Sequence, residues 1–338
     1  MFEIDPDIRR AKTLSSEFYT DERYFELSKE RIFARTWQFA GGPEASSGLT
    51  PFVLLPDFVD EPLVLARNRS EEYCLTNVCT HRGKILVEEA CDANLIRCGY
   101  HGRRFSLDGK FLSMPEFEGV ENFPSAADDL RQISYGERGG FRFVSLDPAA
   151  PFDEFVGEAG CFNDLSSPAP PVVSTNDYHV NAHWALYCEN YLEGFHIPFV
   201  HRSLNEIVDY GTYTTETFRY SSLQTGFDSD GTIAGQYLFV FPNTMFNFYP
   251  WGVSVNVIEP LWPSSCRVRF LTYVSDESNA GKGAGADLDR VELEDEAVVE
   301  SVQKGVRSRF YEHGRYSPTR EQGTHHFHRL IAEFLGRA

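Results

Sequence analysis

The sequence predicts an α+β protein in which a small all-β domain precedes a larger domain that combines long strands with helices. Apolar residues recur at helical spacing near the N-terminus, and short apolar runs separated by turn residues follow from Leu49. Beyond a break at 147–151, the pattern becomes one helix, several long strands and a final helical region. We therefore expect a helical segment at 1–40 that packs on the last domain, and domains at 41–147 and 148–338.

The elements of the first half follow from local patterns. Residues 14–40 form the expected helical segment, with charged residues between its apolar positions. The runs 52–55 and 63–66 predict small antiparallel strands because Pro, Gly, Asn and Asp separate them. Asp108-Gly109 predicts a hairpin turn of type I′. The run 141–146 predicts the strand that closes this domain.

Composition narrows the possible functions. The net charge of −19 argues against binding to nucleic acid or to an anionic membrane, since both need a basic surface. Residues 1–6 lack a basic region and an apolar run, so we expect neither a signal peptide nor a transmembrane segment. Five of the seven cysteines are scattered, and we interpret them as buried free thiols of a cytoplasmic protein.

Two short motifs, each with one cysteine and one histidine, organise the first half. Cys79-x-His81 is followed, sixteen residues later, by Cys98-x-x-His101, and a glycine follows each histidine within two residues. Two thiolates and two imidazoles can hold a zinc ion or a Rieske [2Fe–2S] cluster, in which two histidines replace two cysteines on one iron. Structural zinc sites more often contain Cys-x-x-Cys pairs, so the spacing favours the cluster over zinc.

A second constellation follows the pattern Glu-x-x-His-x-x-x-x-His within 189–201. Glu193 and His196 are three residues apart, and we expect them to share one face of a helix. On an ideal helix His196 and His201 would point about 140° apart, but Pro198 should disrupt the helix and let both imidazoles reach one ion. With one carboxylate they would form the facial triad of a non-haem Fe(II) oxygenase. The alternative is an interior histidine and a surface histidine separated by a helix end.

The third ligand of such a triad must be a carboxylate further along the chain. Residues 293–303 contain four acids beside an apolar helix face, which we expect at Leu293, Ala297, Val298 and Val302. The alternative is that these acids are solvated and merely favourable near the start of a helix. The four candidates are Glu294, Asp295, Glu296 and Glu300.

These motifs resemble those of the ring-hydroxylating oxygenase family, whose members carry a Rieske [2Fe–2S] cluster and a mononuclear Fe(II). The resemblance covers nearly the whole chain from residue 33. Lys84 and Tyr100 stand where respiratory Rieske proteins have cysteines, so the resemblance implies no disulfide beside the cluster. It also implies an all-β Rieske domain and a catalytic domain of the helix-grip (START-like) type, with an antiparallel sheet.

The resemblance also implies roles for individual residues. The cluster ligands would be Cys79, His81, Cys98 and His101. The iron ligands would be His196, His201 and the acid that opens a D-x-x-x-x-E stretch, which is Asp295, with Glu294 as the alternative. Glu193 matches the acid that bridges a Rieske histidine of one subunit to an iron-binding histidine of the next, although many members have Asp there. Asn190 lies beside this motif and would support the iron site, or else pack within the helix.

The second half most resembles the choline monooxygenase branch, in segments 213–216, 222–224, 294–305, 314–316 and 325–328. This implies a terminal oxygenase that uses O2 to hydroxylate or N-demethylate a small quaternary ammonium or N-methyl compound. Aromatic residues in the expected strands 237–242 and 245–251 could form a cation–π cage or simply strand core. The alternatives are an aromatic-ring hydroxylating oxygenase and a non-catalytic Rieske electron carrier with a ligand-binding domain.

The sequence also suggests what must accompany the chain. It contains no fingerprint for nicotinamide or flavin, so electrons from NAD(P)H would arrive through a separate reductase or ferredoxin. Because the family's cluster and iron communicate across subunits, the resemblance implies a ring of subunits, most often a homotrimer. His325, His326 and His328 are expected to be ordinary helix packing rather than a metal site.

Overall fold

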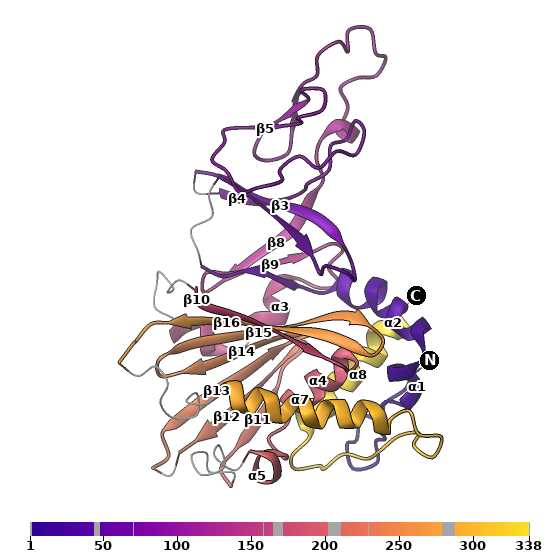
Figure 1. Cartoon of the computed structure of the whole chain (residues 1–338), viewed down its shortest axis with the longest axis vertical. Helices are drawn as coiled ribbons and strands as arrows, with labels where there is room; N and C mark the ends of the chain where they lie inside the picture. Colours follow the sequence, from indigo (N-terminus) through magenta and orange to yellow (C-terminus); the bar gives the residue numbers. More distant parts are fainter. Residues whose placement is uncertain are drawn as a thin grey trace.

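Two antiparallel sheets follow one another along the long axis of the molecule (Figure 1). The computed structural model describes residues 2–43, 48–69, 71–157, 159–164, 172–201, 211–228, 230–278 and 288–337. Strands and helices are mixed as predicted, with a small all-β part at one end, which confirms the α+β class. Within the described ranges, no helix has the length and hydropathy needed to cross a bilayer.

The N-terminal segment packs on the second half of the chain. It contains helices α1 (Ser16–Thr20) and α2 (Glu22–Arg31) and the 3-10 turn η1 (Phe33–Arg35). The rings of Phe18 and Phe33 lie 6.4 and 4.9 Å from that of Trp184. The expectation of helix up to residue 40 was wrong at its end, because Gln38–Gly41 forms strand β1, which pairs with Phe141–Ser145, strand β9.

The first sheet has six strands in the order β1-β9-β8-β4-β3-β2, and a three-stranded sheet β5-β6-β7 lies beyond it. The predicted strands at 52–55, 63–66 and 141–146 all belong to the larger sheet. The remaining strands are β2 (Leu49–Leu54), β3 (Glu61–Asn68), β4 (Glu71–Thr76), β5 (Ile96–Arg97), β6 (Arg104–Phe105), β7 (Phe111–Ser113) and β8 (Gln132–Arg138), with the short turn η2 (Ala126–Asp128) before β8.

The hairpin predicted at Asp108-Gly109 is present, but its turn is not of type I′. That type needs positive φ at both central residues, and only Gly109 has it, at 86°. The amide of Gly109 instead bonds the carbonyl of Ser106, and the amide of Ser106 bonds the carbonyl of Lys110. The connection between β6 and β7 is therefore the five residues 106–110 rather than the two-residue loop of a type I′ hairpin.

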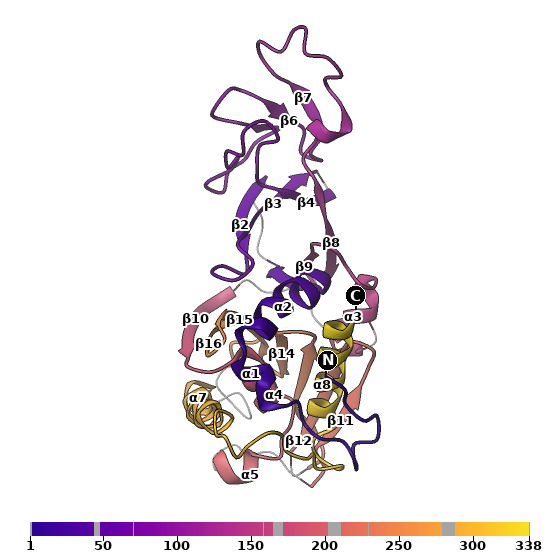
Figure 2. The same ribbon diagram turned by 90° about the vertical axis from the view of Figure 1, so that its right-hand side faces the viewer.

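The second sheet has seven strands in the order β10-β16-β15-β14-β13-β12-β11. Helix α4 packs against β15 and α7, whereas α8 packs against β11 and α2, so these helices connect the sheet with the N-terminal segment (Figure 2). The strands are β10 (Val172–Val180), β11 (Thr214–Thr217), β12 (Ser221–Phe227), β13 (Ile233–Val240), β14 (Thr244–Tyr249), β15 (Gly252–Trp262) and β16 (Ser265–Val274). The helical elements are α3 (Phe152–Val156), η3 (Gly160–Asp164), α4 (Trp184–Tyr191), α5 (Ile197–Val200), α7 (Leu288–Gly305) and α8 (Gln322–Gly336).

One hydrophobic core joins the two large sheets. Phe141 and Phe143 of β9 lie 5.2 and 6.1 Å, ring to ring, from Phe246 of β14. A separate, smaller core surrounds Cys79 and Cys98 at the far end of the molecule. Four of the five scattered cysteines are buried and form no disulfide, as predicted, but Cys91, whose backbone pairs with that of Leu49, is exposed.

Candidate metal centre

The segment that carries the two histidines of the second constellation is a turn between two helices. Helix α4 ends at Tyr191 and α5 begins at Ile197 with Pro198 in its first turn. The expectation that Glu193 and His196 share a helix face was therefore wrong. The Glu193 carboxylate instead accepts bonds from the Phe195 amide and, at 3.1 Å, the His196 amide, so it holds the turn that leads into α5.

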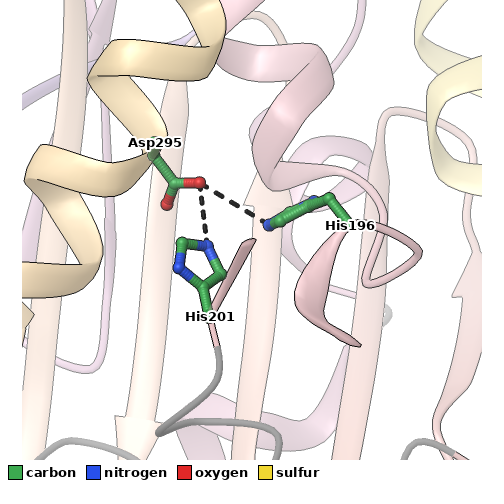
Figure 3. Close-up of side chains that lie close together, drawn as sticks. All are labelled: His196, His201 and Asp295. Atoms are coloured by element: carbon green, nitrogen blue, oxygen red, sulfur yellow. Dashed lines mark hydrogen bonds and ion pairs between the residues drawn. The ribbon is translucent and has the colours of Figure 1, made fainter. Parts of the chain in front are cut away.

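This turn and helix α7 bring three predicted ligands together (Figure 3). The Oδ1 atom of Asp295 lies 3.0 Å from Nε2 of His201 and 3.6 Å from Nε2 of His196. One donor atom from each residue lies within 4.8 Å of the other two. Two imidazole nitrogens and a carboxylate oxygen at this separation suit a divalent first-row metal ion, which leaves positions open for further ligands.

The second nitrogen of each imidazole is held by another carboxylate. Nδ1 of His201 lies 2.8 Å from Oε2 of Glu294, and Nδ1 of His196 lies 2.7 Å from Oε1 of Glu193. A carboxylate accepts the Nδ1 proton, so the lone pair of Nε2 is left for a metal. This arrangement supports Asp295 rather than Glu294 as the carboxylate ligand, because Glu294 contacts the nitrogen that points away from the shared point.

The charges around His201 determine its protonation in the metal-free protein. Burial favours the neutral imidazole, but bonds and attraction from Asp295 and Glu294 outweigh burial and raise the pKa of His201. The pKa of Glu294 is lowered, first by its bond to His201, and a nearby arginine, Arg290, adds to this effect. A metal ion would therefore have to displace a proton from this histidine.

Asn190 supports the carboxylate of the triad. Its side-chain amide donates a 2.6 Å bond to Oδ1 of Asp295, from the last turn of α4. The hydrogen bond links α4 to α7 and fixes the direction of the carboxylate. Asn190 therefore lies where a group that orients a metal ligand would be expected.

Helix α7 turns a different face inward from the one predicted. Leu293 and Val302 of the predicted apolar face are 60% and 43% exposed. Glu292, Val299 and Gln303 are buried in their place, because Tyr187 and the backbone amide of His183 provide hydrogen-bond donors to the two polar side chains. The sequence interpretation missed Glu292, although its spacing of three residues from Asp295 places both on one helix face.

A cavity of about 830 Å³, counted with its open mouth, lies at the triad. Its walls include the triad, Asn190 and Glu193, together with tyrosines from several elements. Tyr237 and Tyr249 come from the strands expected to line a pocket, whereas Phe239 and Phe246 of the same strands are buried in the core. Besides the triad and its supports, the lining includes Tyr187, Tyr191, Tyr213, Tyr237, Tyr249, Asn247, Asn256 and Glu292.

The two Cys-His motifs of the first half form turns of matching geometry. The Gly83 amide bonds the Cys79 carbonyl at 3.0 Å, and the Gly102 amide bonds the Cys98 carbonyl at 3.1 Å. Both glycines have positive φ, 69° and 75°, which explains their place after each histidine. The rings of His81 and His101 consequently lie only 4.8 Å apart.

The donor set of these turns fits a [2Fe–2S] cluster better than one zinc ion. Within the part of the chain that the structure describes, no three donor atoms of the two motifs gather within 4.8 Å, as tetrahedral zinc would require. The thiols of Cys79 and Cys98 instead pair with each other, as the imidazoles do. Nδ1 of His101 is buried without a hydrogen-bond partner among the described residues, as expected for a metal donor.

Local hydrogen bonds favour the thiolate form at Cys98. Burial acts against the charged form, but the Tyr100 amide donates to Sγ at 3.4 Å, and together with further donors and Lys84 it lowers the pKa of Cys98. The ring of Tyr100 stacks on that of His101 with centroids 3.7 Å apart, and it is exposed. The ring of Tyr100 therefore lies between the imidazole of His101 and solvent.

Comparison with known proteins identifies both halves. Residues 54–124 match the Rieske [2Fe-2S] domain, and residues 212–337 match the ring hydroxylating alpha subunit (catalytic domain). The chain is 30% identical to the chloroplastic choline monooxygenase of Arabidopsis thaliana over 97% of this chain and 85% of that protein. It is also 30% identical to the carnitine monooxygenase oxygenase subunit of Escherichia coli K12, over 96% and 94% of the two chains. A crystal structure of the quaternary ammonium Rieske monooxygenase CntA superposes with a TM-score of 0.80 at 27% identity, covering 98% and 96%.

Proposed function

This chain belongs to the family of Rieske non-haem iron oxygenases, as a ring-hydroxylating alpha subunit, and from that premise we propose that it oxidises a small quaternary ammonium or N-methyl compound. The reaction would be hydroxylation or oxidative N-demethylation, with O2 and with electrons from a separate reductase or ferredoxin. The relatives named above act on choline and carnitine, which supports this substrate class. Because the relatives of this chain are oxygenases, the alternative of a non-catalytic Rieske electron carrier is set aside.

The observation that carries the proposal is the tyrosine wall of the cavity at the triad. The rings of Tyr213 and Tyr237 lie 6.4 Å apart and nearly parallel, and Tyr249 lies 6.1 Å from Tyr237 at 80°. Burial raises the pKa of Tyr237 to about 12, so its ring is an uncharged phenol at neutral pH. Uncharged aromatic rings arranged in this way attract a quaternary ammonium group through cation–π contact.

The described side chains have distinct roles in this proposal. His196, His201 and Asp295 would hold the mononuclear iron, which activates O2 with electrons supplied by the cluster when both are bound. Glu193 and Glu294 hold the imidazoles with Nε2 toward the shared point. Asn190 fixes the carboxylate of Asp295. The tyrosines exclude water from one side of the substrate and place its methyl groups at the triad.

Electron transfer would take place between subunits of a homotrimer. Glu193 already bonds His196 of its own chain, which is half of the bridge expected for the family. Two aromatic side chains beside it, Phe195 and Phe199, are 41% and 76% exposed. Apolar groups in such positions favour contact with a second chain. The trimer and a cytoplasmic location are predictions that follow from the resemblance and the composition.

The test is product formation with a surrogate reductase, NADH and O2. The substrates are choline-like and betaine-like compounds beside simple aromatic acids, with products measured by mass spectrometry and formaldehyde by a colour reaction. We expect a product heavier by one oxygen atom, labelled from oxygen-18 gas, or formaldehyde, from an ammonium compound. His196→Ala protein is the control for chemistry at the cluster or in the reductase alone.

Oxidation of the aromatic acids alone would overturn the proposal in favour of the aromatic-ring oxygenase. The tyrosine wall would then act as a slot for a flat ring rather than a cage for a cation. Reductase oxidation of NADH without any product, from protein with full iron content, would contradict both substrate classes.

A further inference from the structure

A polar patch, formed by Asn247, Ser254 and Asn256, lies on the face of the second sheet that borders the cavity. Tyr237 of β13 stands opposite Asn247 of β14, which in turn stands opposite Ser254 of β15. Side chains in such positions share one face of a sheet, and Asn256, two residues beyond Ser254, shares it too. Tyr237, Asn247 and Asn256 all line the cavity. The polar patch therefore lies beside the tyrosine wall.

The polar patch is buried, so its hydrogen bonds matter for its stability. Asn247 and Asn256 are each 5% exposed, and Ser254 is 1% exposed. Ile258, the next residue on this face of β15, is apolar and fully buried. Burying an amide costs free energy unless its donors and acceptors find partners. Amides at these positions therefore need partners within the protein or a ligand that supplies them.

The hydrogen bonds of the polar patch run in one direction. The Tyr191 hydroxyl lies 3.0 Å from Oδ1 of Asn247 and 3.4 Å from the Phe246 carbonyl, so its proton goes to the shorter contact. The amide nitrogen of Asn247 then donates to Oδ1 of Asn256 at 3.3 Å. The Ser254 hydroxyl donates to the same oxygen at 3.2 Å. Two donors therefore converge on the side-chain oxygen of Asn256.

The side-chain nitrogen of Asn256 is left with unused N–H groups. A primary amide has two donors on its nitrogen and two acceptor positions on its oxygen. Both acceptor positions of Asn256 are used, whereas no acceptor for its Nδ2 occurs among the residues that the structure describes. Because Asn256 lines the cavity, an oxygen atom of a bound ligand is the partner that suits this donor.

Helix α4 fixes the polar patch relative to the triad. Asn190 donates to Oδ1 of Asp295, and the next residue, Tyr191, donates to Asn247. Strands β13 and β15 are two strand spacings apart, about 10 Å. A cation binds within about 6 Å of an aromatic ring centre, and a donor lies about 3 Å from its acceptor. A small molecule can therefore contact both the tyrosine wall and Asn256.

We propose that Asn256 is a specificity-determining residue whose side-chain amide donates a hydrogen bond to an oxygen atom of the substrate. The inference rests on the proposed function and narrows it to ammonium compounds in which a short carbon chain joins the nitrogen to a hydroxyl or carboxylate oxygen. Contacts at both ends fix which carbon atom faces the triad. A simple alkylammonium ion makes only the contact with the tyrosine wall and leaves the amide unpaired, which weakens its binding.

Binding to the oxidised holoenzyme without reductase tests the inference apart from turnover. Two pairs of ligands differ only in the oxygen group: choline with ethyltrimethylammonium, and γ-butyrobetaine with propyltrimethylammonium. Isothermal titration calorimetry should show tighter binding of the oxygen-bearing member of at least one pair, roughly 3- to 10-fold for the hydroxyl or roughly 10- to 100-fold for the carboxylate. The pair that shows the preference identifies the oxygen group that Asn256 recognises.

The matched variants are Asn256→Leu and Asn176→Leu. Both asparagines pair with Phe270 from the two strands that flank it, but Asn176 is exposed on β10 and does not line the cavity. Leucine has nearly the shape of asparagine and no donor, so Asn256→Leu should bind both members of each pair equally. Asn176→Leu should keep the native preference. Near-UV circular dichroism and iron content show whether each variant is folded.

The outcomes separate this inference from the proposed function. If the native holoenzyme shows no preference within either pair, or if Asn256→Leu keeps the native preference, the inference is wrong and ammonium oxidation stands. If no ammonium compound binds or is oxidised by the native holoenzyme, the proposed function fails and the inference with it. Should Asn256→Leu not fold, Asn256→Ala, which leaves room for water to bond Ser254 and Asn247, should also lose the preference, and its retention would contradict the inference.

Discussion

Each imidazole of the triad contacts a carboxylate at both of its nitrogens. Asp295 lies at Nε2 of His196 and His201, whereas Glu193 and Glu294 hold the two Nδ1 atoms. A histidine held at both nitrogens is already oriented for metal binding before a metal arrives. The geometry of the centre therefore depends on groups that need not contact the metal.

Replacing His196 by alanine should remove the mononuclear iron and leave the cluster in place. The intact protein should contain about three iron ions per chain, two in the cluster and one at the triad, and the variant about two. Iron analysis and the visible absorption of the cluster measure the two sites separately, and turnover should be lost. His179→Ala, at an exposed position on β10, is the control and should keep the full iron content.

If the cluster absorption disappeared from the His196 variant as well, the division of ligands into two sites would be wrong. Spacing alone nominated His196 and His201, because few side chains bind iron and the pattern is short, whereas Asp295 was selected from four acids by the family resemblance. Glu292 could not be found in this way. A buried acid and a solvated acid look the same in a sequence, and only the partner Tyr187, 105 residues away, distinguishes them.

At the scale of single elements, the turn between α4 and α5 brings Gly194 close to the ring of Tyr213. A Cβ atom there would lie 2.9 Å from Cε1 and 3.1 Å from Cζ of Tyr213, a cavity residue. Gly194→Ala should therefore displace the Tyr213 ring from the proposed cage, at a cost of about 1–3 kcal/mol. We expect the KM of the ammonium substrate to rise at least several-fold.

The control for this change is Gly305→Ala at the end of α7, where a Cβ atom would have no neighbour within 4 Å. Equal KM values for Gly194→Ala and the native chain would show that Tyr213 has no part in substrate binding. Iron content should stay unchanged in both variants, which separates a substrate effect from loss of the metal.

Whether a segment forms a helix or a strand was easier to predict than which face of it points toward the core. The strands at 52–55, 63–66 and 141–146 were recognised because their apolar runs end at turn residues. The inward face of α7 was not, since its apolar residues Leu293 and Val302 face outward while Glu292 and Gln303 find buried partners. Tertiary hydrogen bonds override the apolar pattern there, and no local pattern reports them.

At the scale of the whole molecule, the end that carries the Cys-His motifs contains an ion pair in which the arginine is buried and the aspartate is partly exposed. The guanidinium of Arg103 is 2% exposed, lies among the rings of Phe105, Phe111 and Phe123, and bonds Oδ1 of Asp128 at 2.7 Å. This bond, more than any other contact, lowers the pKa of Asp128. The pair links the segment before β8 to the core around the Cys-His motifs.

The lowered pKa predicts acid sensitivity with a definite sign. Because the folded-state pKa of Asp128 lies below its unfolded value, the stabilisation is complete above about pH 4 and is lost as the pH falls through the folded-state pKa. Asp128→Asn should therefore be less stable than the native chain at about pH 7, and the difference should shrink at about pH 3. Denaturant unfolding followed by circular dichroism measures the free energy of unfolding of both proteins at each pH.

Glu88→Gln is the comparison variant, because the ion pair between Glu88 and Lys84 is exposed, and surface ion pairs contribute little to stability. It should behave as the native chain does at both pH values. A difference between Asp128→Asn and the native chain that stays constant with pH would mean that Asp128 acts through its shape and neutral hydrogen bonds rather than through its charge.

Two sheets were predictable from the sequence, but their shared core was not. Phe141 and Phe143 could be placed on a strand by pattern, whereas their contact with Phe246 joins residues about a hundred positions apart. Contacts at such separation depend on how the two halves dock, and this is not encoded in any short stretch.

The pairing of β1 with β9 also bears on how such proteins can be recombined. Gln38 lies opposite Val144, so the chain enters and leaves the all-β half through adjacent strands, while α1 and α2 stay packed on the other half. In topological terms the electron-carrying half is an insertion within the oxygen-activating half. Two splice points side by side would suffice to exchange it for the equivalent half of a relative, which could change the redox partner without altering the chemistry at the substrate.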